Sequence, residues 1–459
     1  MSGIQPYLEE CIANIFQAGK TTASRRIIVG FSGGLDSTVL LHLLQAYVKA
    51  QPTLPLLALH VNHGLQAQAD EWEQLCVQKG ESYGVKTYAM RANVERNAGD
   101  GMEQAARHAR YQVFADFLQE GDLLCLAHHQ DDQAETVLYR LLRGSGPLGL
   151  AAMRSRKPFA EAQVVRPLLS CSRKELEEYA QLHQLTWVDD PSNLDASFDR
   201  NYLRREIMPR LKSRWPAVNE TFSRAAELNQ ETVLLLEELA TSDLAAVACE
   251  DGLRLCRQQL KQLSPPRINN VLRFWLLKNG RPLPSRANLL RIREELLGSQ
   301  AAGLAVVEWA GAEVRIFEDR LYCMPNLIPA PRVGTEIIWK EALSGQQLDL
   351  GAEAGTLLVT AAQGQGIKSQ LFEQACEQGR LIIKWREGGE RCQPEDRAHS
   401  QKLKKLLQEY HVPPWLRGRL PLVYIGEQLA AVPGLWVCKG FAAQPEEKGC
   451  ELDWRYPSK

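Results

Sequence analysis

Three short stretches in the N-terminal half combine residue types that handle phosphates and protons. The first is SGGLDS (32–37), which follows the apolar run RIIVGF and opens a segment with helical spacing. Gly33 and Gly34 lack a Cβ atom, so the backbone there can turn tightly and direct its N–H groups at an anion. Ser32 and Ser37 add hydroxyl donors at the start of a helix, whose dipole also favours negative charge. The stretch therefore predicts a phosphate-binding loop.

Asp36 is the unusual member of this loop. A carboxylate in an anion site is repulsive unless a divalent cation joins it to the phosphates. The sequence therefore predicts an Mg²⁺–nucleotide complex with Asp36 at the metal. No lysine lies between Arg26 and Lys49, so the loop differs from the one that holds the β- and γ-phosphates in ordinary NTPases.

The second stretch is AHHQDDQAETV (127–137), which follows an apolar run. On a helix, Glu135 lies about one turn after Asp132 and faces the same side. Such a pair of carboxylates can hold an ammonium group and accept a proton from it. His128 and His129 stand at the end of the preceding strand, where they can contact phosphate or orient the acids. A metal site or a solvated helix start is the alternative interpretation.

The third stretch is rich in arginine. FDRNYLRRE (198–206) places Arg200, Arg204 and Arg205 near the end of the candidate catalytic region. A guanidinium group matches phosphates or a carboxylate in a bidentate manner. Three arginines on one helix also fit a solvated face, so the pattern alone leaves both interpretations open.

Two histidines and two further arginines complete the candidate site. His60 lies in the apolar run PLLALHVNH. Asn62, His63 and Gly64 lie at the tip of that expected strand, where an adenine or a ribose can lie, although a simple strand-end turn fits equally well. Arg110 and Arg143 lie in predicted helices and are candidates for substrate and phosphate contacts.

Alternating strand-like and helix-like patterns predict how these stretches come together. The expected strands cover 26–31, 55–63, 85–94 and 121–129, the expected helices cover 37–49, 67–83, 102–119, 130–143 and 172–183, and 154–169 is expected to be a turn with one short strand. Short connections between strands and helices predict an α/β fold, with a Rossmann-like parallel sheet and helices on both faces. Ligands in such folds lie beyond the carboxyl ends of the strands, so the three stretches are expected around one crevice.

The pattern changes after Pro216. We expect a catalytic domain (1–216), a mainly helical substrate-recognition domain (217–325), a connector (326–355) and a small C-terminal α+β domain (356–459). A chain of 459 residues is long enough for several such domains.

Charge is unevenly distributed along a chain whose net charge is only −1. Residues 225–253 carry seven acids and no lysine or arginine, whereas residues 254–293 carry ten basic residues and no acid. The field of the basic segment can attract a polyanion. The alternative is a basic helical face that only neutralises the acidic segment before it.

Bulk composition limits the class of protein. Hydrophobic residues make up 45% and charged residues 24% of the chain, as in a globular protein. No stretch approaches the roughly 20 apolar residues that a membrane span needs, so we expect a cytoplasmic protein with no membrane partner. The eleven cysteines contain no C-x-x-C pair, which predicts reduced thiols. The sequence gives no indication of the oligomeric state.

Several stretches resemble a known family. SGGLDS is similar to the signature of the PP-loop ATP pyrophosphatases, which cleave ATP between the α- and β-phosphates and transfer AMP to an oxygen. AHHQDDQAETVLYRLLRGSGPLGLAAM (127–153) resembles the long signature of the tRNA(Ile)-lysidine synthetase family. The segments 60–70, 103–111 and 187–211 are similar to the remaining blocks of its catalytic domain. PPWLRGRLPLVYIGEQLAAVPGLWV (413–437) is similar to the C-terminal domain of its longer members.

The resemblance implies an ATP-dependent ligase. Members attach L-lysine to the wobble cytidine of a tRNA(Ile) with a CAU anticodon through an adenylylated tRNA, with release of AMP and pyrophosphate. For catalysis it implies Asp36, Asp132, Glu135 and Arg205. For ATP and pyrophosphate it implies Ser32, Gly33, Gly34, Leu35, Asp36, Ser37, His60, His63, His128 and Arg143. For tRNA or substrate it implies Arg110, Arg200, Arg204, Arg273, Lys278, Arg281, Lys404 and Arg417.

Other functions share parts of this pattern. A 2-thiocytidine or 2-thiouridine synthetase also carries S-G-G-x-D-S, but such enzymes handle sulfur through paired cysteines, and this sequence has no C-x-x-C. GMP and asparagine synthetases need a glutaminase domain, for which no candidate segment is present in this sequence. A non-catalytic tRNA-binding protein would have no reason to keep Asp36 together with Asp132 and Glu135.

Overall fold

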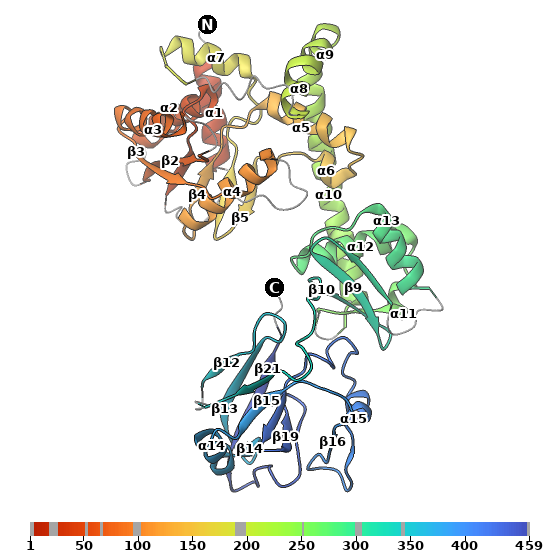
Figure 1. Cartoon of the computed structure of the whole chain (residues 1–459). Helices are drawn as coiled ribbons and strands as arrows, with labels where there is room; N and C mark the ends of the chain where they lie inside the picture. The colour runs from red at the N-terminus through yellow and green to blue at the C-terminus, as the bar shows by residue number, and fades with distance from the viewer. Residues whose placement is uncertain are drawn as a thin grey trace. The chain divides into compact units, whose positions relative to one another are not determined.

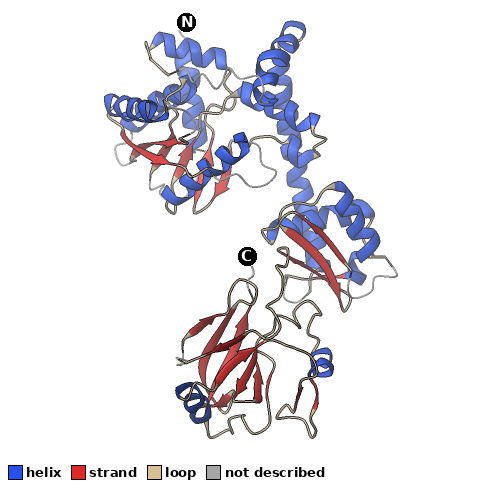
Figure 2. Cartoon of the chain, viewed as in Figure 1, coloured by secondary structure: helices blue, strands red, loops and turns tan. Residues whose placement is uncertain are grey.

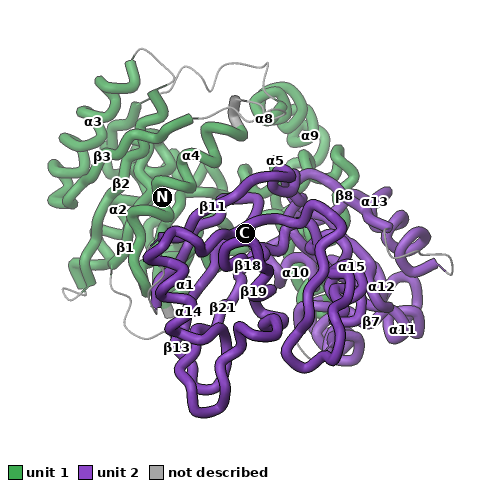
Figure 3. The backbone as a smooth tube through the Cα atoms, turned by 60° about the horizontal axis from the view of Figure 1, so that its bottom comes forward, with its two compact units in different colours: residues 1–236 green, residues 237–459 purple. Residues whose placement is uncertain are grey.

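The computed structural model describes residues 4–17, 26–50, 54–64, 68–94, 102–188, 199–249, 252–298, 305–340 and 345–456. Residues 189–198 of the motif 187–211 and residues 341–344 of the predicted connector lie outside the described residues. The chain forms two compact units, Met1–Leu236 and Glu237–Lys459 (Figure 3). Each unit is described by itself.

Unit 1 alternates strands and helices over most of its length (Figure 1). Its elements are α1 (Ile4–Gln17), β1 (Ile27–Gly30), α2 (Leu35–Lys49), β2 (Leu56–Asn62), α3 (Ala69–Ser82), β3 (Lys86–Arg91), α4 (Met102–Phe117), β4 (Leu123–Cys125), α5 (Gln130–Leu142), α6 (Pro147–Leu150), β5 (Arg156–Phe159), β6 (Ala162–Val165), α7 (Arg173–Leu182), α8 (Asp199–Tyr202), the π-helical turn η2 (Leu203–Ile207), α9 (Met208–Arg214) and α10 (Val218–Val247).

The strands of unit 1 form one six-stranded sheet in the order β3-β2-β1-β4-β6-β5. The pairs from β3 to β6 are all parallel, and only the edge strand β5 runs antiparallel to its neighbour β6. The predicted parallel sheet is therefore confirmed. The prediction of one short strand over 154–169 was wrong, because the turn at 160–161 closes an antiparallel β5–β6 hairpin.

Helices cover both faces of this sheet (Figure 2). Successive residues of a strand point to opposite faces, and in β1 the buried Ile27 and Val29 pack with α1, α2 and α7, whereas Ile28 packs with Phe114 of α4 on the other face. The central strands β1 and β4 are apolar on both faces because helices cover both faces there, as expected for a parallel sheet. The arrangement leaves the carboxyl ends of β1, β2 and β4 to carry the polar residues.

The end of unit 1 is helical. The segment α8–η2–α9 runs from 199 to 214 without a break, and the wider π-helical turn lies in its middle. The mainly helical region expected after Pro216 begins with the 30-residue helix α10, and the division between the two units falls within this helix.

Unit 2 contains shorter elements and more sheet. They are β7 (Leu255–Cys256), α11 (Arg257–Leu260), α12 (Pro265–Lys278), α13 (Arg286–Arg291), the π-helical turn η3 (Ile292–Leu296), β8 (Val306–Trp309), β9 (Ala312–Phe317), β10 (Arg320–Met324), β11 (Glu336–Ile338), β12 (Gln347–Asp349), β13 (Thr356–Gln363), β14 (Ile367–Lys368), α14 (Ser369–Glu377), β15 (Leu381–Lys384), β16 (Arg391–Cys392), β17 (Gln401–Lys402), α15 (Leu403–Glu409), β18 (Leu422–Ile425), β19 (Gln428–Val432), β20 (Trp436–Val437) and β21 (Lys448–Arg455).

Separate cores hold the parts of unit 2 together. The first lies between α12 and the antiparallel sheet β7-β10-β9-β8, around the fully buried Trp275. The second joins the sheets β11-β15-β18-β19-β20 and β12-β13-β21-β14 with α14, around Phe372. The C-terminal α+β fold expected from the sequence is confirmed, and the region before it contains a sheet as well as helices.

Two bulk predictions can be compared with this fold. Within the described ranges, every helix is too short or too polar to cross a membrane. All eleven cysteines are free thiols in this structure, and seven of them are buried.

Candidate active site

The loop between β1 and α2 has the conformation that its glycines predict. Gly33 has a φ of +79°, and a Cβ atom there would lie 2.7 Å from Cys76 Sγ, so only glycine fits without strain. Ser32 Oγ and Ser37 Oγ lie 3.1 Å apart, and Ser37 Oγ also donates to the Gly34 carbonyl at 3.1 Å. The two hydroxyls and the N-terminus of α2 thus face one side of a tight turn.

Asp36, in the first turn of α2, contacts a residue that follows β4 and so connects the loop with the end of that strand. Its Oδ2 atom lies 3.6 Å from His129 Nε2 and 3.4 Å from Arg173 Nη1. Its Oδ1 atom is buried and has no hydrogen-bond partner in the described part of the chain. Asp36 therefore keeps one oxygen available for a ligand.

The start of α5 brings three further groups to this point. His129 is 1% exposed, and its Nε2 atom also lies 3.5 Å from Asp132 Oδ2. Burial alone would lower the pKa of His129, but the carboxylates of Asp132, Asp36 and Asp131 raise it above its ordinary value. The ring is therefore poised to carry a positive charge between these acids.

Asp132 and Glu135 form the expected pair on α5, and both are almost fully buried. Burial raises the pKa of Asp132, yet His129 and Arg200 outweigh it, so that this pKa lies well below its ordinary range. Asp132 Oδ2 accepts a hydrogen bond from the His129 backbone N–H at 3.2 Å. The same carboxylate thus closes the first turn of its own helix.

Arg204 occupies the space in front of this pair. Its Nε atom donates to Glu135 Oε1 at 2.7 Å, and its Nη2 atom donates to Glu135 Oε2 at 2.8 Å and to Asp132 Oδ1 at 2.7 Å. Arg200 approaches the same two carboxylates, with Nη2 at 3.4 Å from Asp132 Oδ1 and Nε at 3.6 Å from Glu135 Oε2. Two arginines therefore neutralise two buried carboxylates, an arrangement that a bound cation would have to share or replace.

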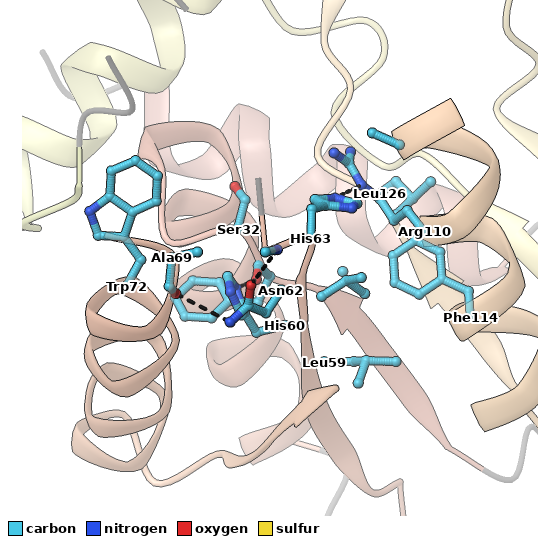
Figure 4. A pocket seen from close by; sticks show the side chains of 15 residues that line it. Ser32, Leu59, His60, Asn62, His63, Ala69, Trp72, Arg110, Phe114 and Leu126 are labelled. Atoms are coloured by element: carbon cyan, nitrogen blue, oxygen red, sulfur yellow. Dashed lines mark hydrogen bonds between the residues drawn. The ribbon is translucent and has the colours of Figure 1, made fainter. Parts of the chain in front are cut away.

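A cavity of about 310 Å³ opens beside the loop, between α3 and α4 (Figure 4). Its lining comprises Gly30, Phe31, Ser32, Leu59, His60, Val61, Asn62, His63, Gly64, Ala69, Trp72, Ala106, Arg110, Phe114 and Leu126. Most of the wall is apolar or aromatic, and a few polar groups stand at the tip of β2. Such a lining is typical of a site for a flat, partly polar small molecule.

Burial keeps the two histidines of this cavity in their neutral forms. His60 Nδ1 donates to the Phe31 carbonyl at 3.0 Å, and burial lowers its pKa. Arg110 Nε donates to His63 Nε2 at 3.1 Å, and burial together with Arg110 lowers the pKa of His63 to about 4. Burial also lowers the pKa of His128 to about 3. At neutral pH these rings act as uncharged hydrogen-bonding groups.

The residues fit a Mg²⁺ ion that arrives with a nucleotide. In the described part of the chain, no cluster of three or more His, Cys, Asp or Glu side chains is arranged to hold a metal ion by itself. Mg²⁺ is commonly bound through one or two carboxylates and the phosphates of its substrate. The buried and unpartnered Oδ1 atom of Asp36 supplies one such ligand next to the loop.

Two predicted site residues lie away from this cluster. Arg205 is exposed on η2, whereas the neighbouring Arg204 contacts the carboxylates. Arg143 follows the last residue of α5 and donates to Tyr139 at 2.6 Å. Because an α-helix rises 1.5 Å per residue, Arg143 lies about 20 Å from the N-terminal end of α5, where Asp132 is located. The roles implied for Arg205 and Arg143 stay predictions.

Eight residues are implied for tRNA or substrate: Arg110, Arg200 and Arg204 lie in unit 1, and the other five lie in unit 2. Arg273 and Lys278 are exposed on α12, Arg281 is half-buried, and Lys404 is exposed on α15, while Arg417 is half-buried and donates from Nε to the Val412 carbonyl at 2.8 Å.

Part of the basic segment 254–293 pairs with acids of unit 2. Arg267 forms hydrogen bonds to the buried Asp243, Arg257 lies 3.4 Å from Asp319, and Arg291 lies 2.7 Å from Glu295. Arg267 thus neutralises one member of the acidic segment, as the alternative interpretation of the segment predicted.

Arg173, Asp131 and Lys212 were not predicted as site residues. The Arg173 backbone N–H donates to Asp131 Oδ2 at 3.0 Å, and Lys212 Nζ forms an ion pair with Asp131 Oδ1. Together they link α7 and α9 to the start of α5. The one sequence signal was Asp131, which follows His129 by two residues in the same motif.

Family models cover most of the chain. Residues 5–211 match the PP-loop domain, residues 255–322 match the TilS substrate binding domain, and residues 381–454 match the TilS substrate C-terminal domain. A tRNA(Ile)-lysidine synthase of Coxiella burnetii is 38% identical over 95% of this chain and 94% of its own length. That of Alkalilimnicola ehrlichii is 40% identical over 91% of each chain.

The chain belongs to the tRNA(Ile)-lysidine synthase family. The resemblance inferred from SGGLDS and the later motifs is confirmed. Membership of the tRNA(Ile)-lysidine synthase family also makes the chain an ATP-dependent ligase, because the PP-loop domain is the ATP-using part of such an enzyme.

Solved structures show weaker likeness. The U34-tRNA thiolase NcsA of Methanococcus maripaludis aligns with a TM-score of 0.43 and 20% identity over 50% of this chain and 79% of its own. A TILS C-terminal domain aligns over 27% of this chain and all of its own, with a TM-score of 0.21 and 17% identity.

Proposed function

We propose that this chain ligates L-lysine to C2 of the wobble cytidine of a tRNA(Ile) with a CAU anticodon. ATP is split into AMP and pyrophosphate in the course of the reaction. The observation that carries the proposal is the 3.6 Å contact between Asp36 Oδ2 and His129 Nε2. It joins the phosphate-binding loop to the carboxylate pair of α5, so a nucleotide and an amine can be held side by side.

The cavity beside β2 supports binding of the adenosine half of ATP. Apolar walls such as Phe114 and Trp72 can pack on a base, and the neutral His60 and His63 can form hydrogen bonds to a base or a ribose. Ser32 is shared by the cavity and the loop, so the phosphates would extend from the cavity toward the N-terminus of α2.

Asp36 would hold the Mg²⁺ ion together with the phosphates. Bound there, the ion neutralises the charge that develops on the leaving pyrophosphate. The C2 carbonyl oxygen of cytidine attacks the α-phosphorus, the bond to pyrophosphate breaks, and AMP is carried on the cytidine oxygen. The loop hydroxyls of Ser32 and Ser37 can donate to the departing phosphates.

Asp132 and Glu135 would then receive the lysine substrate. Its ε-ammonium group can pair with the two buried carboxylates. In doing so it replaces the contacts that Arg204 now makes with them. The amine loses a proton to the carboxylate pair, attacks C2, and AMP leaves with the former carbonyl oxygen. Because the low pKa of Asp132 keeps it ionised at neutral pH, it is suited to hold the ammonium group.

The tRNA body would be held by exposed basic residues of unit 2. Arg273 and Lys278 lie on one helix and Lys404 on another, which suits contacts to a phosphate backbone rather than to one base. Affinity from such contacts falls steeply with salt concentration.

A product assay tests the proposal. The full chain is incubated with ATP, Mg²⁺, radiolabelled lysine and a CAU-anticodon tRNA(Ile) transcript, beside a matched transcript with uridine at the wobble position. Label in the first transcript only, with release of AMP, is the expected result. AMP release without incorporation of lysine would leave adenylyl transfer in place but refute lysine as the nucleophile.

Asp36→Asn separates chemistry from tRNA binding. It removes the charge proposed to hold Mg²⁺, so AMP formation should fall about 100-fold or more, while the Kd for tRNA stays within about twofold. The matched control is Asp116→Asn, an exposed carboxylate of α4 that pairs with Gln112 and should leave both quantities unchanged. Loss of tRNA binding in Asp36→Asn would contradict this division of roles.

A further inference from the structure

Two cysteines that lie far apart in the sequence meet beside the candidate active site. Cys11 lies on α1, and Cys171 precedes the first turn of α7. The Cys171 thiol donates to Cys11 Sγ across 3.7 Å, and Cys11 Sγ lies 3.7 Å from Ser170 Oγ. Cys171 is fully buried, whereas Cys11 is half-buried. Cys11 is therefore the accessible thiol of the pair, and Cys171 is the buried thiol in contact with it.

The environment of Cys11 favours its thiolate form. The hydrogen bond from Cys171 lowers the pKa of Cys11, burial opposes this, and hydrogen bonds with Ser170 and Tyr7 lower it as well, so that the pKa lies at about 6. The carboxylate of Glu175 acts in the opposite direction but is weaker. At neutral pH Cys11 is thus a nucleophile with a second thiol in contact, the arrangement typical of redox-sensitive cysteines.

The backbone around Cys171 also holds the candidate active site. Its carbonyl accepts the N–H of Gln130, the first residue of α5, at 2.8 Å. Two residues later, Arg173 binds Asp131 through its backbone N–H and approaches Asp36 through its side chain. A shift at Cys171 therefore reaches both the loop helix and the carboxylate helix.

We propose that Cys11 and Cys171 form a reversible disulfide that lowers the rate of the ligase reaction. The oxidant is a low-molecular-weight disulfide such as oxidised glutathione. The Cys11 thiolate attacks one of its sulfurs, a mixed disulfide forms, and one thiolate leaves. Cys171 then loses its proton and attacks Cys11 Sγ, the mixed disulfide breaks, and the second thiol leaves.

The geometry explains why this bond would disturb the site. A disulfide bond is about 2.05 Å long, so the two sulfurs must approach by about 1.6 Å from their separation of 3.7 Å. Leu8 and Ile12 fix α1 in the core, so part of this movement falls on Cys171. Misplacement of reacting groups by about 1 Å can cost up to about 100-fold in rate, so a loss of at least about tenfold is expected.

The test begins with the full chain in its unmodified form. It is equilibrated with oxidised glutathione, digested without reduction, and examined by mass spectrometry for the peptide that joins Cys11 to Cys171. Finding this peptide is the expected result, and its absence would overturn the proposal. The mass measurement does not depend on the proposed function, whereas the rate measurement rests on it, so the two can fail separately.

Activity and variants complete the test. Oxidation should lower lysine incorporation at least about tenfold, and dithiothreitol should restore it. Cys11→Ser should keep the activity of the reduced enzyme and lose the response to oxidant. Cys256→Ser, which removes a half-buried thiol of β7 outside the pair, should keep the response. Equal inactivation of Cys11→Ser and the unmodified chain by oxidant would overturn the proposal.

Discussion

Removal of the Arg204 side chain tests the arrangement of charges at the start of α5. Arg204→Ala deletes three hydrogen bonds of 2.7–2.8 Å to Glu135 and Asp132. Both carboxylates are almost fully buried, so the substitution leaves their negative charges with one neutralising arginine fewer. The adjacent Arg205→Ala is the matched control, because it removes the same side chain from an exposed position of the same turn.

The expected loss of stability follows from burial. Breaking a fully buried ion pair costs about 3–5 kcal/mol, whereas an exposed pair contributes about 0–1 kcal/mol. The Arg204 side chain is 36% exposed, and Arg200 remains within 3.4 Å of Asp132. We therefore expect Arg204→Ala to lower the free energy of unfolding by about 2 kcal/mol, and Arg205→Ala by less than about 0.5 kcal/mol.

Thermal unfolding measures the difference. For a unit of this size, 1 kcal/mol corresponds to about 2–4 °C in Tm, so the unit 1 transition of Arg204→Ala should fall by about 4–8 °C, and that of Arg205→Ala by less than about 2 °C. Calorimetry of the full chain follows this transition. An equal or larger fall in Arg205→Ala would refute the assignment of Arg204 to the carboxylate pair.

Three further variants test the loop, the buried histidine and the basic segment. Gly33→Ala puts a Cβ into the left-handed turn, so its Tm should fall and the KM for ATP should rise in a steady-state assay. The pKa of His129 is raised in the folded protein, so its protonation stabilises the fold below about pH 6.5, and this contribution is lost as the pH rises through the raised pKa. The fall in Tm caused by His129→Asn should therefore be larger at about pH 6 than at about pH 9. Reversing Arg273, Lys278 and Arg281 together should raise the KM for tRNA, leave that for lysine unchanged and flatten the dependence of tRNA binding on salt. An unchanged KM for tRNA would make that segment structural.

Periodicity was sufficient to predict most of the catalytic fold. The apolar runs 26–31 and 55–63 predicted strands whose carboxyl ends meet, and the structure confirms that β1 and β2 pair in parallel. The spacing of Asp132 and Glu135 likewise predicted a pair on one face of α5, since helix geometry alone fixes that relation.

Contacts that depend on tertiary structure could not be read in this way. Arg204 and Arg205 are chemically equivalent neighbours that lie within a π-helical turn, and Arg204 is the one that contacts the carboxylates. Regular helical spacing does not predict such a turn. Arg173 and Cys171 act on residues more than 40 positions away, so nothing in their local sequence indicated the site.

The two carboxylate oxygens of Asp132 make different contacts. Oδ2 accepts the His129 N–H and closes the first turn of α5, while Oδ1 faces the arginines. A side chain one methylene longer would have to release either the turn or the contact with the arginines, so the position admits little variation. Under the proposed function, a new amine specificity would have to evolve through Glu135 and the arginines, with Asp132 retained as a fixed anchor.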